Sequence, residues 1–263
     1  MSRMPSNSLD RALLLLQFIA KTPGGMTNLE VSREFGLARS SCSYILNRLA
    51  KEGYLARDKS TLKYRIGLKN LILGRNALRE AGFRAVSEPT LYRLAVDTGL
   101  AANLAVLEGN RVILLDRVEG PAFVKAAVDQ STEDRGRDRV PHGFKEEYMG
   151  REHRDIGSEL PVYTTALGKV LLANISDSEF AEYTEHVPPA TSGIQVGELA
   201  SELQQIREKG YCFAKFEPHN ESCALAAPIF DGNETVKAGL AVSCKRHLPI
   251  WNDERALSEM VKE

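Results

Sequence analysis

Apolar residues in the first third of the chain recur every three or four positions, in three short runs. The first run lies between Ser8, which is suited to be an N-cap, and the turn-forming segment TPGG, and it predicts a helix over about 8–21. Its apolar positions are Leu9, Leu13, Leu16 and Ala20. The second run, NLEVSREF, predicts a short helix that Thr27 caps at its start and Gly36 ends in a left-handed conformation.

The third run, GLARSSCSYILNRLAKEGYL, combines an apolar stripe with a polar face. Its apolar positions follow the spacing i, i+3, i+4, i+7 and are Cys42, Ile45, Leu46 and Leu49. On a helix these side chains point inward. The outward face then carries Ser40, Ser41, Ser43, Tyr44, Asn47, Arg48 and Lys51. Two helices joined by a tight turn, the second presenting hydroxyl, phenol, amide and guanidinium groups, are typical of a module that reads the major groove of DNA.

The segment YLARDKSTLKYRI, after Gly53, predicts two short strands about a polar tip. A hairpin in this place forms the wing of a winged helix-turn-helix, where Arg57 and Lys59 would meet phosphates. We therefore predict a winged helix-turn-helix DNA-binding domain over residues 1–66. The candidate DNA-binding residues are Thr27, Arg39, Ser40, Ser41, Ser43, Tyr44, Asn47, Arg48, Arg57 and Lys59. A protein-interaction module with a serine-rich surface is the alternative interpretation.

The hydrophobic pattern changes after the wing. The segment GLKNLILGRNALREAGF predicts a linker helix over 67–84, and a further amphipathic helix is expected from the SEP turn to Gly99. Strands are expected in AANLAVLE, RVILLDRV, AFVKAAV, GYCFAKFE and the two halves of CALAAPIFDGNETVKAGLAVSC, and helices in TALGKVLLANI and GELASELQQIREKG. Residues 85–263 are thus predicted to form an antiparallel sheet with flanking helices, and the fold class is α+β.

Charge divides the chain near the same place. Residues 1–84 carry 15 Lys+Arg against 6 Asp+Glu, and the whole chain carries 34 against 35, which leaves 19 against 29 for residues 85–263. The first part therefore has a net charge of +9 and the second −10. A basic part joined to an acidic one indicates that the first part binds a polyanion, in agreement with the predicted DNA interface.

Several functional classes lack support in the sequence. Four cysteines form no CxxC pair, and the first residues show no signal-peptide pattern, so we expect no metal site, no disulfide scaffold and a reduced, cytoplasmic protein. No apolar run near the start is long enough to span a membrane. No nucleophile–base or paired-carboxylate set stands near a predicted strand, so we expect no enzyme, no catalytic residue and no cofactor. A small-molecule enzyme or an interaction module remains the alternative function.

The segment VYTTALGKVLLA carries the candidate ligand chemistry. Thr164 or Thr165 can cap a helix whose first N–H groups, around Ala166 to Gly168, would point at an anion such as a carboxylate. The segment is not a phosphate-binding loop, because the first glycine of such a loop is replaced by tyrosine and the lysine is followed by valine. A plain capped helix with Lys169 in solvent is the alternative.

Five segments in this order resemble the IclR family of bacterial transcription regulators: SLDRALLLLQFI, GLARSSCSYILNRLAKEGYL, YRIGLKNLILGRNAL, TALGKVLLA and GYCFAKFE…LAAPIFD…AGLAVS. The resemblance covers nearly the whole chain. It implies a homodimer or a dimer of dimers (a homotetramer) that binds a pseudo-palindromic operator in double-stranded DNA, with repression favoured over activation. It also implies a GAF-like C-terminal domain in which a small organic effector alters operator affinity.

The resemblance also identifies effector-pocket positions. Where members that bind small oxo-acids have an acidic residue, a cysteine and two serines, this chain has Ala214, Ala224, Ala241 and Ser243. With Ala166, Leu167 and Gly168 these are the candidate effector-binding residues. Only Ser243 of these four residues is polar, so the implied pocket is roomier and more apolar than that of the oxo-acid-binding members. Such a pocket favours an aromatic or longer aliphatic acid, or a ligand with no carboxylate.

Two further departures from the family matter. Ser43 and Tyr44 stand where many members have a basic pair, so the operator sequence does not follow from the relatives. Residues 129–160 form a charged, glycine-containing insertion, which we interpret as a solvated excursion; a lid beside the effector pocket is the alternative.

Overall fold

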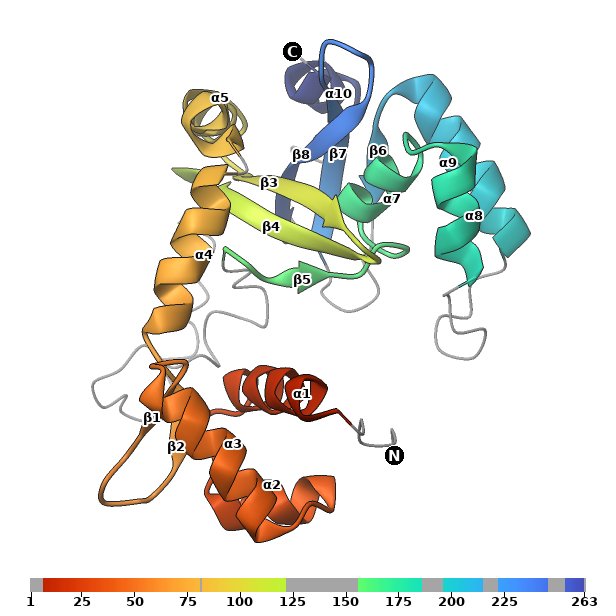
Figure 1. The fold of residues 1–263 in the computed structure, drawn as a ribbon. Helices are drawn as coiled ribbons and strands as arrows, with labels where there is room; N and C mark the ends of the chain where they lie inside the picture. The colour runs from red at the N-terminus through yellow and green to blue at the C-terminus, as the bar shows by residue number, and fades with distance from the viewer. Residues whose placement is uncertain are drawn as a thin grey trace, which may run out of the picture. The chain divides into compact units, whose positions relative to one another are not determined.

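The computed structural model describes residues 7–80, 82–121, 156–185, 196–214, 222–245 and 254–262 (Figure 1). The chain divides into two compact units, residues 1–81 and 82–263, and each is described by itself. Within the described residues, no helix combines the length and the apolar character that crossing a membrane requires.

The first unit contains the predicted helices and hairpin. Its elements are α1 (Ser8–Ala20), α2 (Asn28–Phe35), α3 (Arg39–Lys51), β1 (Leu55–Arg57), β2 (Tyr64–Ile66) and α4 (Lys69–Glu80). One detail of the prediction is wrong: the N-cap of α1 is Asn7, whose side chain accepts a 2.9 Å hydrogen bond from the backbone N–H of Leu9. Asparagine is as good an N-cap as serine. With Asn7 as the cap, the helix begins at Ser8, one residue earlier than a cap at Ser8 would allow.

The core of the first unit is built by the apolar stripes of its helices and by two wing residues. Its buried members are Leu15, Ile19, Val31, Cys42, Ile45, Leu46, Leu55 and Tyr64, and Leu49 packs against them. The inward stripe predicted for α3 is therefore confirmed. Gly36 ends α2 with a φ of 62°, as the left-handed C-cap requires.

The junction after α4 differs from the prediction. The helix α5 (Phe83–Thr98) follows Gly82, whose φ is 71°, and the expected SEP turn, which ends in Pro89, lies inside α5. A proline inside a helix removes one backbone hydrogen bond. Burial of Leu91, Leu94 and Ala95 in the second half of α5 offsets the loss of this hydrogen bond. Tertiary packing therefore overrides the local turn signal.

The second unit is built on a six-stranded antiparallel sheet, which confirms the predicted fold class. Its strands are β3 (Ala101–Glu108), β4 (Arg111–Val118), β5 (Glu159–Leu160), β6 (Cys212–Ala214), β7 (Ser222–Phe230) and β8 (Val236–Lys245), in the order β5-β4-β3-β8-β7-β6. The end of the predicted insertion, Glu159–Leu160, is an edge strand paired with β4 and not a solvated excursion. The expected strand AFVKAAV and insertion residues 129–155 lie outside the described residues.

Helices cover both faces of this sheet. On one face α7 (Ala166–Leu172) packs across the strands, with α9 (Val196–Lys209) against it; α5 and α10 (Glu254–Lys262) lie together on the other face (Figure 1). The core under α7 includes Ala105, Leu114, Val170, Leu171 and Leu203. We refer to this side of the sheet as the α7 face.

The sequence analysis missed one helix, α8 (Asp177–Glu185). Its segment DSEFAEYTE has too few apolar residues to show a stripe. The available signal was a capping box: Glu179 accepts a 2.9 Å hydrogen bond from the backbone N–H of Ser176, and its own N–H donates to the Ser176 hydroxyl at 3.3 Å.

Candidate DNA interface and effector face

The helix α3 presents the predicted DNA-binding side chains on one surface. Tyr44 has 74% of its surface exposed, Arg39, Ser40 and Arg48 are exposed, and Ser41 and Ser43 are half-buried. No side chain caps the start of α3, where Ala38 is the N-cap. The positive end of this helix is therefore available to a phosphate, and the polar groups behind it are available to base edges.

Thr27 is placed at the start of α2 by a complete capping box. Its hydroxyl accepts a 3.2 Å hydrogen bond from the Glu30 N–H, and the Glu30 carboxylate accepts a 2.7 Å bond from the Thr27 N–H. The bonds that the Thr27 N–H and hydroxyl donate to this carboxylate lower the pKa of Glu30. Because the hydroxyl is occupied within the chain, Thr27 positions α2, and its contact with DNA stays a prediction.

The wing is joined to α3 by side-chain hydrogen bonds that include two of the predicted DNA-binding residues, Asn47 and Ser43. The Tyr64 hydroxyl donates a 2.8 Å hydrogen bond to Oδ1 of Asn47, whose Nδ2 donates a 3.2 Å bond to the Ser43 hydroxyl. The Arg57 guanidinium lies 5.3 Å from the centre of the Tyr64 ring. Asn47 thus ties the wing to α3, Arg57 stacks within the wing on the neighbouring strand, and Lys59 is exposed at the tip.

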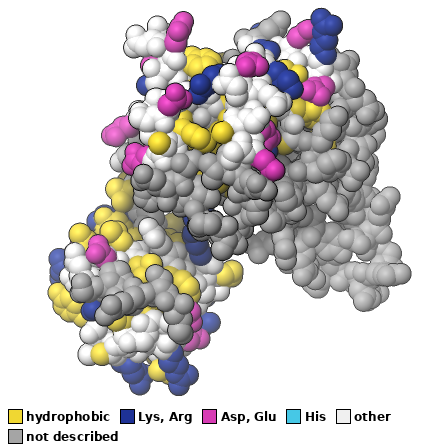
Figure 2. Space-filling view, turned by 90° about the vertical axis from the view of Figure 1, so that its right-hand side faces the viewer, with side chains coloured by type: hydrophobic (Ala, Val, Ile, Leu, Met, Phe, Trp, Pro, Cys, Tyr) yellow, Lys and Arg dark blue, Asp and Glu magenta, His cyan; other side chains and the backbone are white. Residues whose placement is uncertain are grey.

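Two more interactions shape the charge of this unit. Arg48 forms an exposed ion pair with Glu52 at 3.2 Å, one helical turn away. Such a pair is weak, and a phosphate can displace it. Figure 2 shows Lys and Arg side chains at the lower end of the first unit and at other places around its rim. A surface with this excess of positive charge favours contact with a polyanion.

In the second unit, strand register brings the predicted effector positions together on the α7 face. Ala214 lies opposite Ala224, Ala224 opposite Ser243, and Ser243 opposite Ala101. Directly opposed residues of antiparallel strands share a face. The neighbouring cross-strand row is Cys212, Ala226, Ala241, Asn103 and Arg117. The four positions matched through the resemblance are therefore neighbours, and their role in effector binding stays a prediction.

Two polar residues of this face were missed by the sequence analysis. Asn103, 3% exposed, accepts a 3.0 Å hydrogen bond from a terminal nitrogen of Arg117 and donates a 3.0 Å bond to the Ser243 hydroxyl. The Arg117 side chain is 9% exposed, and its Nε lies 3.6 Å from a carboxylate oxygen of Glu119. A signal was present, because Asn103 and Arg117 interrupt otherwise apolar strands. The face combines small apolar side chains with the buried Arg117 guanidinium and Asn103 amide and the half-buried Ser243 hydroxyl.

The start of α7 is more closed than the sequence indicated. The Thr165 hydroxyl accepts a 3.1 Å hydrogen bond from the Gly168 N–H and donates a 2.7 Å bond to the Pro161 carbonyl. Ala166 and Leu167 are buried in the core. A Cβ at Gly168 would overlap the carbonyl oxygen of Val162, so this glycine permits the close approach of two backbones.

Lys169, expected in solvent under the plain-helix alternative, is instead paired. Its Nζ lies 2.6 Å from Oε1 of Glu202 on α9, and its side chain is 19% exposed. The lysine therefore ties α7 to α9. No anion is needed to explain its position.

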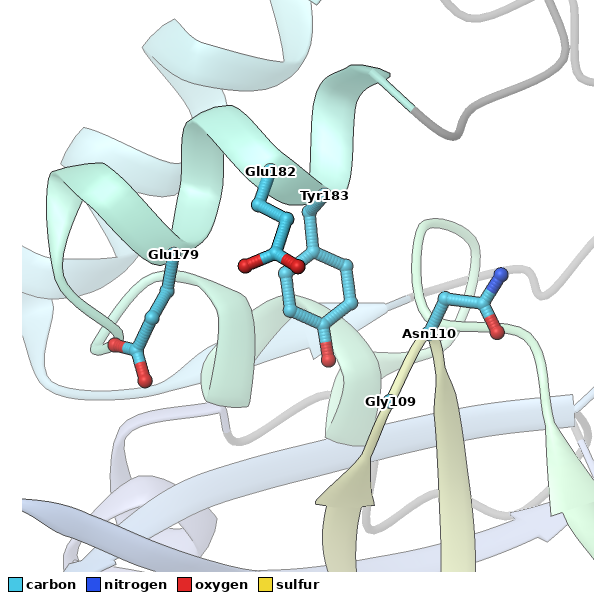
Figure 3. A pocket seen from close by; sticks show the side chains of 5 residues that line it. All are labelled: Gly109, Asn110, Glu179, Glu182 and Tyr183. Atoms are coloured by element: carbon cyan, nitrogen blue, oxygen red, sulfur yellow. The ribbon is translucent and has the colours of Figure 1, made fainter.

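A hollow of about 350 Å³ lies elsewhere in the second unit, between α8 and the β3–β4 turn. Figure 3 shows Glu182 and Tyr183 projecting from α8 toward the turn that holds Gly109 and Asn110; Glu179 completes the lining. Burial, with smaller contributions from Tyr163 and nearby carboxylates, raises the pKa of Tyr183 to about 12. Two carboxylates repel an acid, so this hollow does not suit an organic anion.

The described residues also contain no group of three His, Cys, Asp or Glu side chains arranged to hold a metal ion.

Comparisons with known proteins match both units. Residues 8–59 match the IclR helix-turn-helix domain, and residues 140–263 match the bacterial transcriptional regulator IclR C-terminal family. The chain is 26% identical over 242 residues to the HTH-type transcriptional regulator XynR of Escherichia coli, covering 90% of this chain and 85% of the relative. It is 25% identical to the transcriptional repressor IclR of the same organism, covering 90% of this chain and 79% of that protein.

A solved structure supports the fold. An IclR homologue from Microbacterium hydrocarbonoxydans, determined in complex with 4-hydroxybenzoate, is 20% identical and aligns with a TM-score of 0.69 over 97% of this chain and 95% of that one.

Proposed function

Since the chain belongs to the IclR family of bacterial transcriptional regulators, we propose that it is a cytoplasmic repressor whose first unit binds an operator in double-stranded DNA. An organic acid bound on the α7 face of its second unit alters that binding. The observation that carries the proposal is the single exposed surface of α3, on which Tyr44 and the candidate serines lie together beside a fastened wing.

The proposed binding species is a homodimer, or a dimer of dimers. None of the residues of α4 is buried within the chain; its Leu71 and Ile72 are 70% and 61% exposed, and Leu68, directly before it, is 81% exposed. Leu9 and Leu13 of α1 are also exposed. Apolar stripes of this size favour burial against a second copy. Two recognition helices at a fixed spacing then suit a pseudo-palindromic operator.

The proposed effector is an aromatic or longer aliphatic carboxylic acid. The small side chains at 214, 224 and 241, all alanine, suit a ligand with an apolar body, and the Arg117–Asn103–Ser243 network supplies polar groups on the same face. A guanidinium is the side chain best matched to a carboxylate. The 4-hydroxybenzoate complex of the Microbacterium homologue supports this class of ligand.

The test is fluorescence anisotropy of the full chain with labelled duplex from its own upstream region and with a shuffled duplex of equal composition. We expect preference for the native duplex and a steep loss of affinity between roughly 50 and 200 mM salt. Tyr44→Ala should weaken native-duplex binding by about tenfold, as expected for one lost base contact. The matched control is Tyr92→Ala, which removes a tyrosine that is 64% exposed on α5.

Two results would contradict the proposal. Absence of binding to either duplex at low salt would remove the DNA-binding function and favour an interaction module. Equal losses for Tyr44→Ala and Tyr92→Ala would show that α3 does not read the operator. The relatives named above are transcriptional regulators, and no enzymatic step is part of the proposal.

A further inference from the structure

We propose that Leu62, at the tip of the wing, is an apolar wedge that enters the minor groove beside the operator half-site. The inference rests on the proposed DNA-binding function and adds a contact that the basic and polar candidates do not include. Leu62 is 51% exposed, and its φ is 58°. Among the described residues, the non-glycine residues with positive φ are Leu62 and Glu234.

The turn itself does not explain a leucine at this position. The left-handed conformation costs a residue other than glycine on the order of 1 kcal/mol, and asparagine or glycine would adopt it more easily. The core of the first unit gains nothing from Leu62, because the side chain is not among the residues that form that core or pack against it. A residue that costs backbone energy and stays exposed indicates a role outside the fold.

The tip is held rigidly. One oxygen of Asp58 accepts hydrogen bonds from the N–H and hydroxyl of Ser60, at 2.9 and 2.6 Å, and from the N–H and hydroxyl of Thr61, at 2.8 and 3.0 Å. The Asp58 N–H donates a 2.9 Å bond to the Lys63 carbonyl and closes the loop. Because these polar groups are satisfied inside the loop, the tip presents Leu62 in a fixed conformation at little further entropic cost on binding.

The charges around Leu62 favour DNA over other partners. The segment 55–66 carries Arg57, Lys59, Lys63 and Arg65 against Asp58 alone, a net charge of +3. An apolar side chain flanked by cations is the arrangement with which minor-groove proteins unstack a base step while they hold the phosphates on each side. An apolar patch for a protein partner would instead be larger and less charged.

The position of the wing agrees with this target. The Tyr64–Asn47 hydrogen bond fixes the hairpin relative to α3, and the Arg57–Tyr64 stacking joins the two strands of the hairpin to each other. When α3 lies in the major groove, the tip of a hairpin fixed in this way reaches the neighbouring backbone and the minor groove beyond it. The wedge would therefore favour operators with a flexible pyrimidine–purine step, TA or CA, at that place.

The experiment uses the full chain and its upstream duplex. Hydroxyl-radical footprinting first locates the minor groove that flanks the half-site, and 2-aminopurine then replaces the adenine of the TA or CA steps there. Leu62→Gly should lower operator affinity by about tenfold or more, as expected when one leucine side chain is no longer buried. It should not lower the melting temperature, because glycine relieves the positive φ. Leu62→Met, which keeps an apolar side chain, should bind nearly as the unsubstituted protein does.

Glu234→Gly is the matched control, since it relieves the same backbone conformation, with a φ of 59°, in the β7–β8 turn of the other unit. It should leave DNA affinity unchanged. The fluorescence of 2-aminopurine should rise on binding of the unsubstituted protein and of Leu62→Met, and stay low with Leu62→Gly, because only an inserted side chain unstacks the base.

The inference is overturned if Leu62→Gly binds the operator as tightly as the unsubstituted protein, or if no flanking step brightens with either apolar residue. Loss of the dimer in Leu62→Gly, measured by sedimentation, would also overturn it, because the leucine would then contact protein. Failure of the unsubstituted protein to prefer its upstream duplex contradicts the proposed function, and the wedge with it. Operator affinity that is fully retained in Leu62→Gly, when the unsubstituted protein does prefer its upstream duplex, contradicts the wedge alone.

Discussion

The Tyr64 hydroxyl on the wing and Oδ1 of Asn47 on the recognition helix are joined by a hydrogen bond of 2.8 Å. Tyr64 is 1% exposed, so its ring belongs to the core, while its hydroxyl bonds Asn47, an exposed residue of α3. The bond therefore couples the fold of the first unit to the direction of its wing.

Tyr64→Phe removes this hydrogen bond and keeps the ring. We expect the full chain to lose about 1 kcal/mol in the unfolding free energy of its first unit, because one hydrogen bond with a partly buried partner is lost. Operator affinity should fall several-fold as the wing loses its fixed angle. Urea unfolding and anisotropy measure the two effects. Tyr92→Phe, at a tyrosine exposed on α5, should change neither quantity; an unchanged affinity in Tyr64→Phe would contradict the coupling.

The dimer prediction concerns the exposed stripe of α4. Leu71→Glu combined with Ile72→Glu places two charges where we expect a second copy to pack, and the protein should become monomeric at micromolar concentration. Sedimentation velocity measures the change, and operator affinity should fall with it. Val96→Glu, on the exposed side of α5, is the control. A double variant that remains a dimer would place the interface elsewhere.

The effector prediction concerns Arg117. The unsubstituted protein should bind 4-hydroxybenzoate more tightly than the uncharged 4-hydroxybenzamide, and Arg117→Met should abolish that difference, a loss of about tenfold or more for a charge-assisted hydrogen bond. Isothermal titration calorimetry distinguishes the two probes. Arg111→Met, at the exposed end of the same strand, should retain the difference. Equal affinity for the acid and the amide in the unsubstituted protein would argue against a carboxylate effector.

Gly168→Ala tests the close packing at the start of α7. The added Cβ would overlap the Val162 carbonyl, and we expect a loss of about 3 kcal/mol in stability, at the upper end of overpacking effects. A glycine of α9 with open space around it, Gly197, provides the comparison. Gly197→Ala should be neutral or slightly stabilising, because alanine favours the helix. Equal melting temperatures for the two variants would contradict the packing argument.

The pH dependence of the wing follows from Asp58. Hydrogen bonds from Ser60 and Thr61 hold the pKa of this carboxyl well below its ordinary value, and the bond from the Ser60 hydroxyl is the largest cause. Because the pKa is lower in the folded chain, the ionised carboxylate stabilises the loop at pH values above the ordinary pKa of aspartate. This contribution is lost as the pH falls toward the pKa of the folded chain. The tip should thus persist at about pH 4, near the usual pKa of aspartate, and open only at lower pH.

Amide resonances of Ser60 and Thr61, followed by NMR during acidification, measure this opening. Asp58→Ala should show the open-loop resonances already at neutral pH and should bind the operator more weakly, whereas Asp97→Ala, at an exposed aspartate of α5, should do neither. Opening of the unsubstituted loop well above pH 4 would show that the carboxylate is not its main support.

Most of the first unit could be predicted from the sequence because its signals are local. The capping box of Thr27 and Glu30, the left-handed Gly36 and the spacing of Cys42, Ile45 and Leu46 each act within one or two turns of a helix. The β3–β4 and β7–β8 hairpins followed in the same way from apolar runs about short turns. These features depend on backbone geometry over a few residues, which the sequence specifies directly.

The candidate sites depended on contacts between distant residues. Asn103 and Arg117 become neighbours of Ser243 only through the order β4-β3-β8, and Asn47 meets Tyr64 only when the wing folds back on α3. Pro89 likewise stays inside α5 because the helix beyond it is buried. The sequence by itself determined most of the elements, α8 excepted, and the DNA-binding class. Tertiary structure decided the strand order and the hydrogen-bond partners of polar side chains. Both depend on burial and on cross-strand register, which bring together residues more than a hundred positions apart in the sequence.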